Sequence, residues 1–307
     1  MTTEHQAEGS GGRSIVGALP PHLYFAGSAV FHNLGPAFAV LLFARVDVLG
    51  VAWLRIAAAA LVLSAWCRPW RLARQLNRRQ LTLLVGMGVA LAVMNVVFYL
   101  AINRIPLATV SAIECLGPVV LAAWGARSLR NVGAVGGAAM GAVLLTGVRF
   151  VNEPVGMLLA FANAALFAVY IVLGHRIVRE TTGRPIERLA IAMLFALVVV
   201  TPIGLVAAVP ALRDAHLVAA GVAVGICSSV IPYICDQLAM ARLSRSMFAL
   251  LLFLIPATAA VIGALVLRQF PTVTELTGIA LIAGALSLHR EPEVRGGAES
   301  PPGGVPT

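Results

Sequence analysis

The chain has 307 residues, of which 60% are hydrophobic and 11% are charged, and its mean hydropathy is +0.92. Because charged residues approach a quarter of a soluble domain, this composition excludes an ordinary soluble globular protein and favours a membrane protein. The net charge of +9 comes from arginines that are scattered between apolar runs. They form no basic stripe with interleaved aromatic residues, so we expect no nucleic-acid partner.

Apolar runs long enough to cross a bilayer recur along the chain. A membrane core needs about 20 apolar residues per helix. Runs of that kind lie at 21–44, 48–66, 81–102, 106–126, 132–148, 155–174, 189–209, 217–238, 246–267 and 271–288. Residues 1–20 are predicted to be a cytoplasmic tail, and 291–307, rich in Pro, Gly and charged residues, a disordered cytoplasmic tail. The predicted fold class is an all-α polytopic membrane protein with ten transmembrane helices.

The arginines predict the orientation of these helices. Loops on the cytoplasmic side of a membrane accumulate arginine and lysine. If both termini are cytoplasmic, most of the 22 arginines fall in inner loops, and the outer loops hold only Arg45, Arg104, Arg149, Arg213 and Arg268. The alternation persists loop by loop, which supports the count of ten helices and two cytoplasmic termini.

One segment of the first half of the chain recurs in the second half. Residues 98–125 align without a gap with 236–263, and the identities include Arg104 with Arg242 and Pro118 with Pro256. Five helices per repeat is an odd number, so the second copy must enter the membrane from the opposite side. We therefore predict two inverted five-helix repeats, 21–150 and 151–290, the arrangement of a carrier that works by alternating access.

Several short motifs resemble a known family. They are Leu54-Arg55, Met94-Asn95, Phe98-Tyr99-Leu100, Ile105-Pro106-Leu107, Ile113 to Pro118, Phe167 to Tyr170 with Gly174, and Ile231-Pro232-Tyr233 with Asp236. Over about residues 20–290 the chain resembles the drug/metabolite transporter superfamily, and within it the EamA-type proteins of the threonine/homoserine exporter kind. The resemblance implies a bacterial inner-membrane exporter of small amino acids or related metabolites that is driven by protons. Members commonly carry an acidic residue where this chain has Ile255, and a Gly-Glu pair where it has Arg268-Gln269.

Three charged residues fall within predicted spans: Arg55, Glu114 and Asp236. Charges at membrane depth are rare and are by default candidates for function. Glu114 is predicted to carry a proton or to accept a substrate amine, and the alternative is a structural carboxyl. Arg55 is predicted to bind a substrate carboxylate in the same cavity, and the alternative is a structural salt bridge or snorkelling. Asp236 is expected nearer the lipid–water boundary.

Helix breaks and polar side chains complete the candidate substrate and coupling site. Pro118, with Gly117 before it, and Pro256 are expected to interrupt helices beside the substrate path, although packing kinks are an equal alternative. His32, Asn33, Asn95, Asn163 and Tyr170 are candidates to line the cavity, although many such residues serve helix packing alone. Gly133, Gly137 and Gly141 form a small-residue face, which predicts close helix approach within the fold or between protomers.

The motif search argues against an enzyme. The sequence contains no nucleotide-binding loop, no HExxH, no GxSxG and no paired-cysteine metal motif, so we expect no cofactor and no metal. The predicted partners are a small-molecule substrate, protons and the lipid bilayer. Efflux of cationic drugs is an alternative, and an intramembrane lipid-modifying enzyme is a remote one. The sequence leaves open the exact substrate, the coupling ion and the net direction of transport. It also leaves open the oligomeric state, which could be a homodimer.

Overall fold

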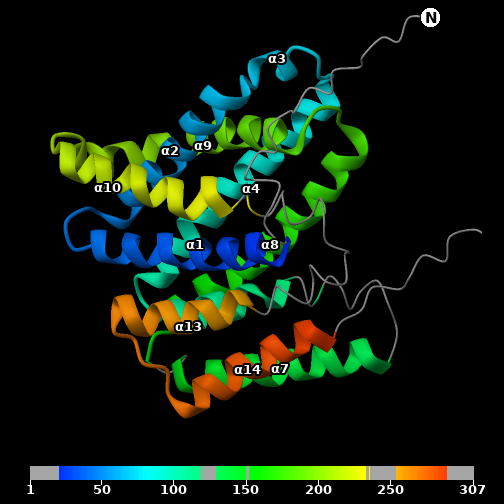
Figure 1. The fold of residues 1–307 in the computed structure, drawn as a ribbon, viewed down its shortest axis with the longest axis vertical. Coiled ribbons are helices and arrows are strands. Elements are labelled where there is room, and N and C mark those ends of the chain that lie inside the picture. The colour runs from blue at the N-terminus through cyan, green and yellow to red at the C-terminus, as the bar shows by residue number, and fades with distance from the viewer. Residues whose placement is uncertain are drawn as a thin grey trace, which may run out of the picture.

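The computed structural model describes residues 21–117, 120, 129–149, 152–232, 235 and 254–288, and every regular element within these ranges is helical. Figure 1 shows the helices in chain order. Their bounds are α1 Pro21–Leu42, α2 Val48–Cys67, α3 Trp70–Ala73, α4 Arg78–Ile102, α5 Leu107–Glu114, α7 Leu129–Arg149, α8 Pro154–Glu180, α9 Pro185–Leu212, α10 Ala215–Gly225, the π-helix η2 Ile226–Val230, α13 Leu254–Leu267 and α14 Val273–Leu288.

Polar side chains fix where several of these helices begin. The carboxylate of Asp47 accepts a hydrogen bond from the Leu49 backbone N–H at the start of α2. At the start of α4 the Asn77 and Gln80 side chains accept each other's backbone N–H groups, at 2.9 and 3.0 Å. Such caps satisfy N–H groups that have no partner inside the helix. Asp47 and Asn77 therefore mark the N-terminal ends of α2 and α4.

Four described helices are long and apolar enough to cross a membrane: α2, α4, α8 and α9. They contain the predicted spans 48–66, 81–102, 155–174 and 189–209. Shorter apolar helical stretches, of 10–17 residues, lie within α1, α7, α10 with η2, α13 and α14. The fold is thus the all-α polytopic membrane fold that the composition predicts, and the count of ten spans in two inverted repeats stays a prediction.

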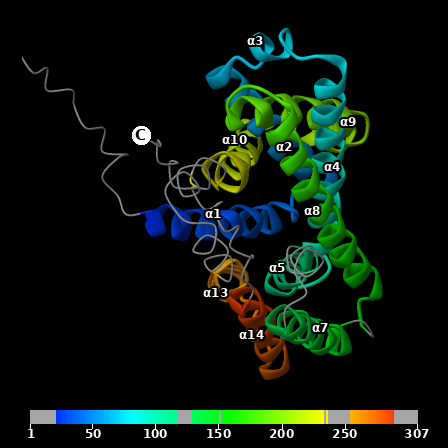
Figure 2. The same ribbon diagram turned by 90° about the vertical axis from the view of Figure 1, so that its right-hand side faces the viewer.

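The helices pack in pairs that are distant in the sequence. Helix α2 packs on α9, α4 packs on α8 and α9, α1 packs on α13, and α7 packs on α14. Figures 1 and 2 both show α7 beside α14 at one end of the molecule, with α2, α3 and α9 at the other. Helix α1 lies between these two groups.

Large apolar side chains cover much of the outer surface. Val206, Leu265 and Val198 are 72%, 77% and 69% exposed, which a soluble protein would avoid over so wide an area. Buried polar residues lie inside instead, among them Asn33, Arg55, Asn95, Glu114 and Asn163. An apolar exterior around a partly polar interior suits a protein that is surrounded by lipid.

Candidate functional site

The Glu114 carboxyl lies at the junction of three helices. It is buried at the end of α5, and its Oε1 accepts a hydrogen bond of 3.1 Å from Nδ2 of Asn163 on α8. Nε2 of His32 on α1 lies 3.8 Å from its Oε2. The His32 side chain is 32% exposed and that of Glu114 9%. A buried carboxyl therefore has a more accessible imidazole beside it, through which a proton can be exchanged.

Helix α5 ends at Glu114, within the predicted span 106–126, and Leu116, Gly117 and Val120 are helical again beyond it. The next residue, Cys115, lies in a turn, and its backbone N–H donates to the Ile113 and Ser111 carbonyls. Proline has no N–H, so Pro118 cannot bond to the Glu114 carbonyl four residues earlier, and its ring crowds that carbonyl. The structure of Pro118 itself lies outside the described residues. Gly117 is described, and a Cβ there would lie 2.7 Å from the Ala164 carbonyl oxygen of α8, so this position needs glycine.

Asn33 joins three helices just beside this carboxyl. It is fully buried, and its Oδ1 accepts a 3.1 Å hydrogen bond from the Ser111 hydroxyl of α5. Its Nδ2 donates to the Ile255 carbonyl at 3.0 Å and to the Thr258 hydroxyl at 2.9 Å, both on α13. Pro256 lies between these two acceptors in the sequence. Asn33 therefore fixes α13, around its proline, to α1 and α5.

Arg55 lies in a second polar cluster, formed by α2, η2 and α4. Its Nε donates to the Ser229 hydroxyl and its Nη2 to the Ser228 carbonyl, both at 3.1 Å. The guanidinium carbon is 5.2 Å from the centre of the Tyr99 ring. The Tyr99 hydroxyl is buried and has no hydrogen-bond partner among the described residues. A guanidinium carries five N–H donors, so these two hydrogen bonds leave donors for another acceptor.

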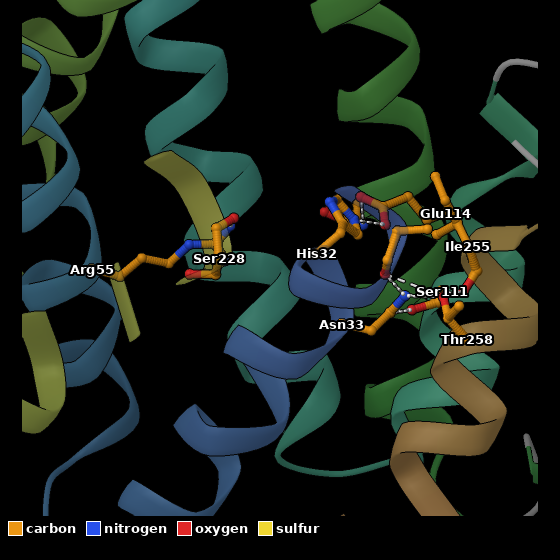
Figure 3. Close-up of polar contacts among 10 residues, drawn as sticks. His32, Asn33, Arg55, Ser111, Glu114, Ser228, Ile255 and Thr258 are labelled. Atoms are coloured by element: carbon orange, nitrogen blue, oxygen red, sulfur yellow. Dashed lines mark hydrogen bonds and ion pairs between the residues drawn. The ribbon is translucent and has the colours of Figure 1, made fainter. Parts of the chain in front are cut away.

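The two clusters are separate in this structure. Figure 3 shows Arg55 pointing toward Ser228, while His32, Asn33, Ser111 and Glu114 gather beside α13. No ion pair joins Arg55 to Glu114. The prediction that both face one cavity therefore stays a prediction.

The other predicted site residues have local roles or lie outside the described residues. The Asn95 side chain donates to the Leu91 carbonyl one turn earlier, at 2.7 Å. Tyr170 stacks on Phe167 with ring centres 6.0 Å apart. The structure of Asp236 is outside the described residues. The sequence analysis did not identify Tyr99, Ser111 or the two serines of η2 as site residues. Tyr99 follows Asn95 by one helical turn and so shares its face, which is a signal that could have identified it.

Comparison with known proteins places the chain in a family. The model of the EamA-like transporter family matches residues 154–289. A threonine/homoserine exporter, RhtA, from Salmonella typhimurium strain LT2 is 33% identical over 269 residues, which cover 85% of this chain and 90% of the exporter. The chain belongs to the EamA-like transporter family. RhtA from Escherichia coli strain K12 is also 33% identical, over 270 residues.

A solved structure supports the fold of this EamA-family chain. A crystal structure that is 22% identical in sequence superposes with a TM-score of 0.59 and covers 87% of this chain and 96% of its own. That likeness concerns the fold alone. The family match confirms the resemblance drawn from the sequence motifs, and it confirms a membrane transporter rather than an enzyme.

Proposed function

We propose that this EamA-family protein exports threonine- or homoserine-like small amino acids across the bacterial inner membrane in exchange for protons. The substrate class is that of the RhtA relatives. The single observation that carries the proposal is the buried Glu114 carboxyl between Asn163 and His32.

Glu114 offers a mechanism for exchange. The Oδ1 of Asn163 is buried without a hydrogen-bond partner among the described residues, although its Nδ2 binds Glu114. Two oxygen acceptors therefore lie near one another, and a substrate ammonium group supplies the donors that both accept. One carboxylate cannot hold a proton and an ammonium group at the same time. Binding of the amino acid thus expels the proton, and proton return expels the amino acid, which is antiport.

Arg55 and Tyr99 supply a site for the substrate carboxylate. The guanidinium has donors left over, and the buried Tyr99 hydroxyl lacks a partner among the described residues. The ammonium and carboxylate of an amino acid are close together, so one molecule reaches both clusters only if they approach each other. We assign that approach to the other state of the transport cycle, in which the substrate stabilises the conformation that it binds better.

The packing of the helices supports two inverted repeats. If α1, α2, α4, α5 and α7 correspond in order to α8, α9, α10 with η2, α13 and α14, the most extensive helix contacts have their counterparts. Helix α2 packs on its own equivalent α9, and α7 on α14; the α1–α13 contact corresponds to α5–α8, and α4–α9 to α2–α10. Such symmetry lets the two halves exchange roles at the two membrane faces during alternating access.

The decisive test is exchange of labelled threonine in proteoliposomes by a Glu114→Gln variant. Glutamine keeps the size of the side chain but neither ionises nor attracts an ammonium group strongly. We expect exchange to fall about tenfold or more, because a hydrogen bond to a charged group contributes about 1.5–3 kcal/mol. The residual rate should also lose its dependence on pH. Glu180→Gln is the control, since Glu180 pairs with Arg79 on the surface. Full exchange with unchanged pH dependence in the Glu114 variant would remove this residue from the mechanism.

A stability screen of the detergent-solubilised protein identifies the substrate class. A ligand that binds only the folded protein raises its apparent melting temperature. We expect threonine or homoserine to do so and quaternary ammonium compounds to have no effect. The opposite result would favour the cationic-drug alternative.

A further inference from the structure

A cavity lies far from Glu114, where the apolar helices end. It has a volume of about 590 Å³ and is formed by the α2–α3 segment and the turn between α8 and α9. That volume lies within the range of small-ligand sites. Figures 1 and 2 show α3 at the top of the molecule, remote from α13 and α14. The cavity therefore plays no part in the substrate site described above.

The cavity is positively charged. Arg68, Arg71 and Arg184 line it, and none of the three forms an ion pair with another described residue. The acidic lining residue is Glu187, and its Oε2 accepts the Arg184 backbone N–H at 3.0 Å. Three guanidinium groups thus converge on a space that contains one engaged carboxylate. Guanidinium groups suit the oxygens of a phosphate, which they bind with paired hydrogen bonds.

The two loops that form the cavity meet at a close contact between Leu72 and Gly183. Leu72 is buried beneath the cavity and packs against Gly183, whose φ is +93°. A Cβ at Gly183 would lie 2.7 Å from Leu72 Cδ2, so glycine is needed both for its conformation and for its size. The two loops that carry the arginines are therefore fixed in contact before any ligand arrives.

Two tryptophans place the cavity at the level of the lipid headgroups. Trp66 and Trp70 are 62% and 50% exposed, and they flank Arg68 at the end of α2. Exposed tryptophan gathers at the boundary between lipid and water, because its ring is apolar and its N–H is polar. Trp66 also lines the cavity. The charged space consequently opens where the phosphates of the bilayer lie.

We propose that this cavity binds the phosphate headgroup of an anionic phospholipid from the surrounding bilayer. Arg68, Arg71 and Arg184 hold the phosphate oxygens, and Gln75 supplies a neutral hydrogen-bonding group at the same cavity. The bound lipid ties the α2–α3 segment to the α8–α9 turn. The proposal concerns a site beyond the exporter function and makes no use of Glu114 or of the transported substrate.

The test is binding of phosphatidylglycerol to the purified full chain, measured by native mass spectrometry. Arg68→Gly with Arg71→Gln removes two charges from the cavity. Arg68 has a φ of 48° at the C-terminal cap of α2, a conformation that glycine adopts without strain, so the helix end is preserved. Arg74→Gln with Arg78→Gln is the matched control, because it removes two charges from the same segment without touching the cavity lining.

We expect the cavity variant to bind phosphatidylglycerol about tenfold more weakly or worse, and the control to stay within about twofold of the original chain. Phosphatidylcholine should bind weakly to all three, and millimolar inorganic phosphate should not displace the bound lipid. Equal losses in both variants would overturn the proposal in favour of general surface charge. Displacement by inorganic phosphate would overturn the lipid as the source of the phosphate.

Cys67 provides a second measurement that needs no variant. It lines the cavity and is half-buried, as is Cys227 in η2, which lies outside the cavity lining. Bound phosphatidylglycerol should slow the reaction of Cys67 with a maleimide and leave Cys227 as an internal reference, both followed by peptide mass spectrometry. An unchanged Cys67 rate at saturating lipid would place the lipid elsewhere.

Discussion

Among the described residues, three buried side-chain atoms lack a hydrogen-bond partner: Ser64 Oγ, Tyr99 Oη and Asn163 Oδ1. Such atoms are rare in folded proteins because each loses its hydrogen bonds to water without replacement. Two of the three lie beside the charged groups that the sequence singles out, Tyr99 beside Arg55 and Asn163 beside Glu114. Under the proposed function, a substrate that binds at both places would supply the missing hydrogen bonds.

Replacement of Arg55 by lysine tests the carboxylate site at the scale of one residue. Lysine keeps the positive charge but loses the planar donors that contact Ser228, Ser229 and a substrate carboxylate. We expect the KM for threonine exchange to rise about tenfold while the maximal rate changes by less than about threefold. The measurement is the concentration dependence of uptake into proteoliposomes, together with the melting temperature of the purified variant.

Arg188→Lys is the matched control for this substitution. Arg188 is also buried, but its guanidinium donates to the Ile177 and Thr181 carbonyls and so caps the end of α8. We expect this variant to melt at a lower temperature with an unchanged KM. If Arg55→Lys behaves in the same way, Arg55 serves packing and not the substrate.

At the scale of the element, the small-residue face of α7 is used inside the fold. A Cβ at Gly141 would lie 2.6 Å from the Gly278 carbonyl oxygen of α14, whereas a Cβ at Gly133 or Gly136 would meet nothing within 4 Å. The contact explains why α7 and α14 pack together so closely. From the sequence alone, this face could pack either against another helix of the same chain or against a second protomer.

Gly141→Ala should therefore destabilise the protein, while Gly136→Ala should not. At Gly141 the added methyl group meets backbone atoms that cannot move away easily, and such overpacking costs about 1–3 kcal/mol. At Gly136 the same change removes backbone freedom from the unfolded chain and stabilises the helix slightly. Thermal unfolding of the two detergent-solubilised variants compares them directly. Equal melting temperatures would show that α7 and α14 can separate without loss.

At the scale of the whole molecule, the predicted orientation is open to a direct experiment. The distribution of arginine among the loops predicts that both termini lie on the cytoplasmic side. A green fluorescent protein fused to the C-terminus should fluoresce, whereas alkaline phosphatase fused at the same point should stay inactive. The same phosphatase inserted at Arg104, in the loop between α4 and α5, should be active. An active C-terminal phosphatase would contradict the predicted cytoplasmic C-terminus.

The sequence by itself determined the class of the fold, most helix positions and the family. Apolar length and arginine distribution reflect the thickness and charge asymmetry of a membrane, and these act on each segment separately. Glu114 and Arg55 were identifiable for the same reason, because an ionised group in an apolar run is conspicuous in the sequence. Glu114 does lie in a polar cluster, and His32 and Asn33 lie with it.

Only the tertiary structure decided which residues meet. The contact of Asn163 with Glu114, of Tyr99 with Arg55 and of Asn33 with Ile255 each joins helices that are far apart in the chain. The basic cavity beneath α3 likewise depends on neighbours brought by folding. Lipid and the protein interior both favour apolar side chains. The sequence of a membrane-spanning helix therefore shows that it is apolar, but it does not show which of its faces packs against which neighbouring helix.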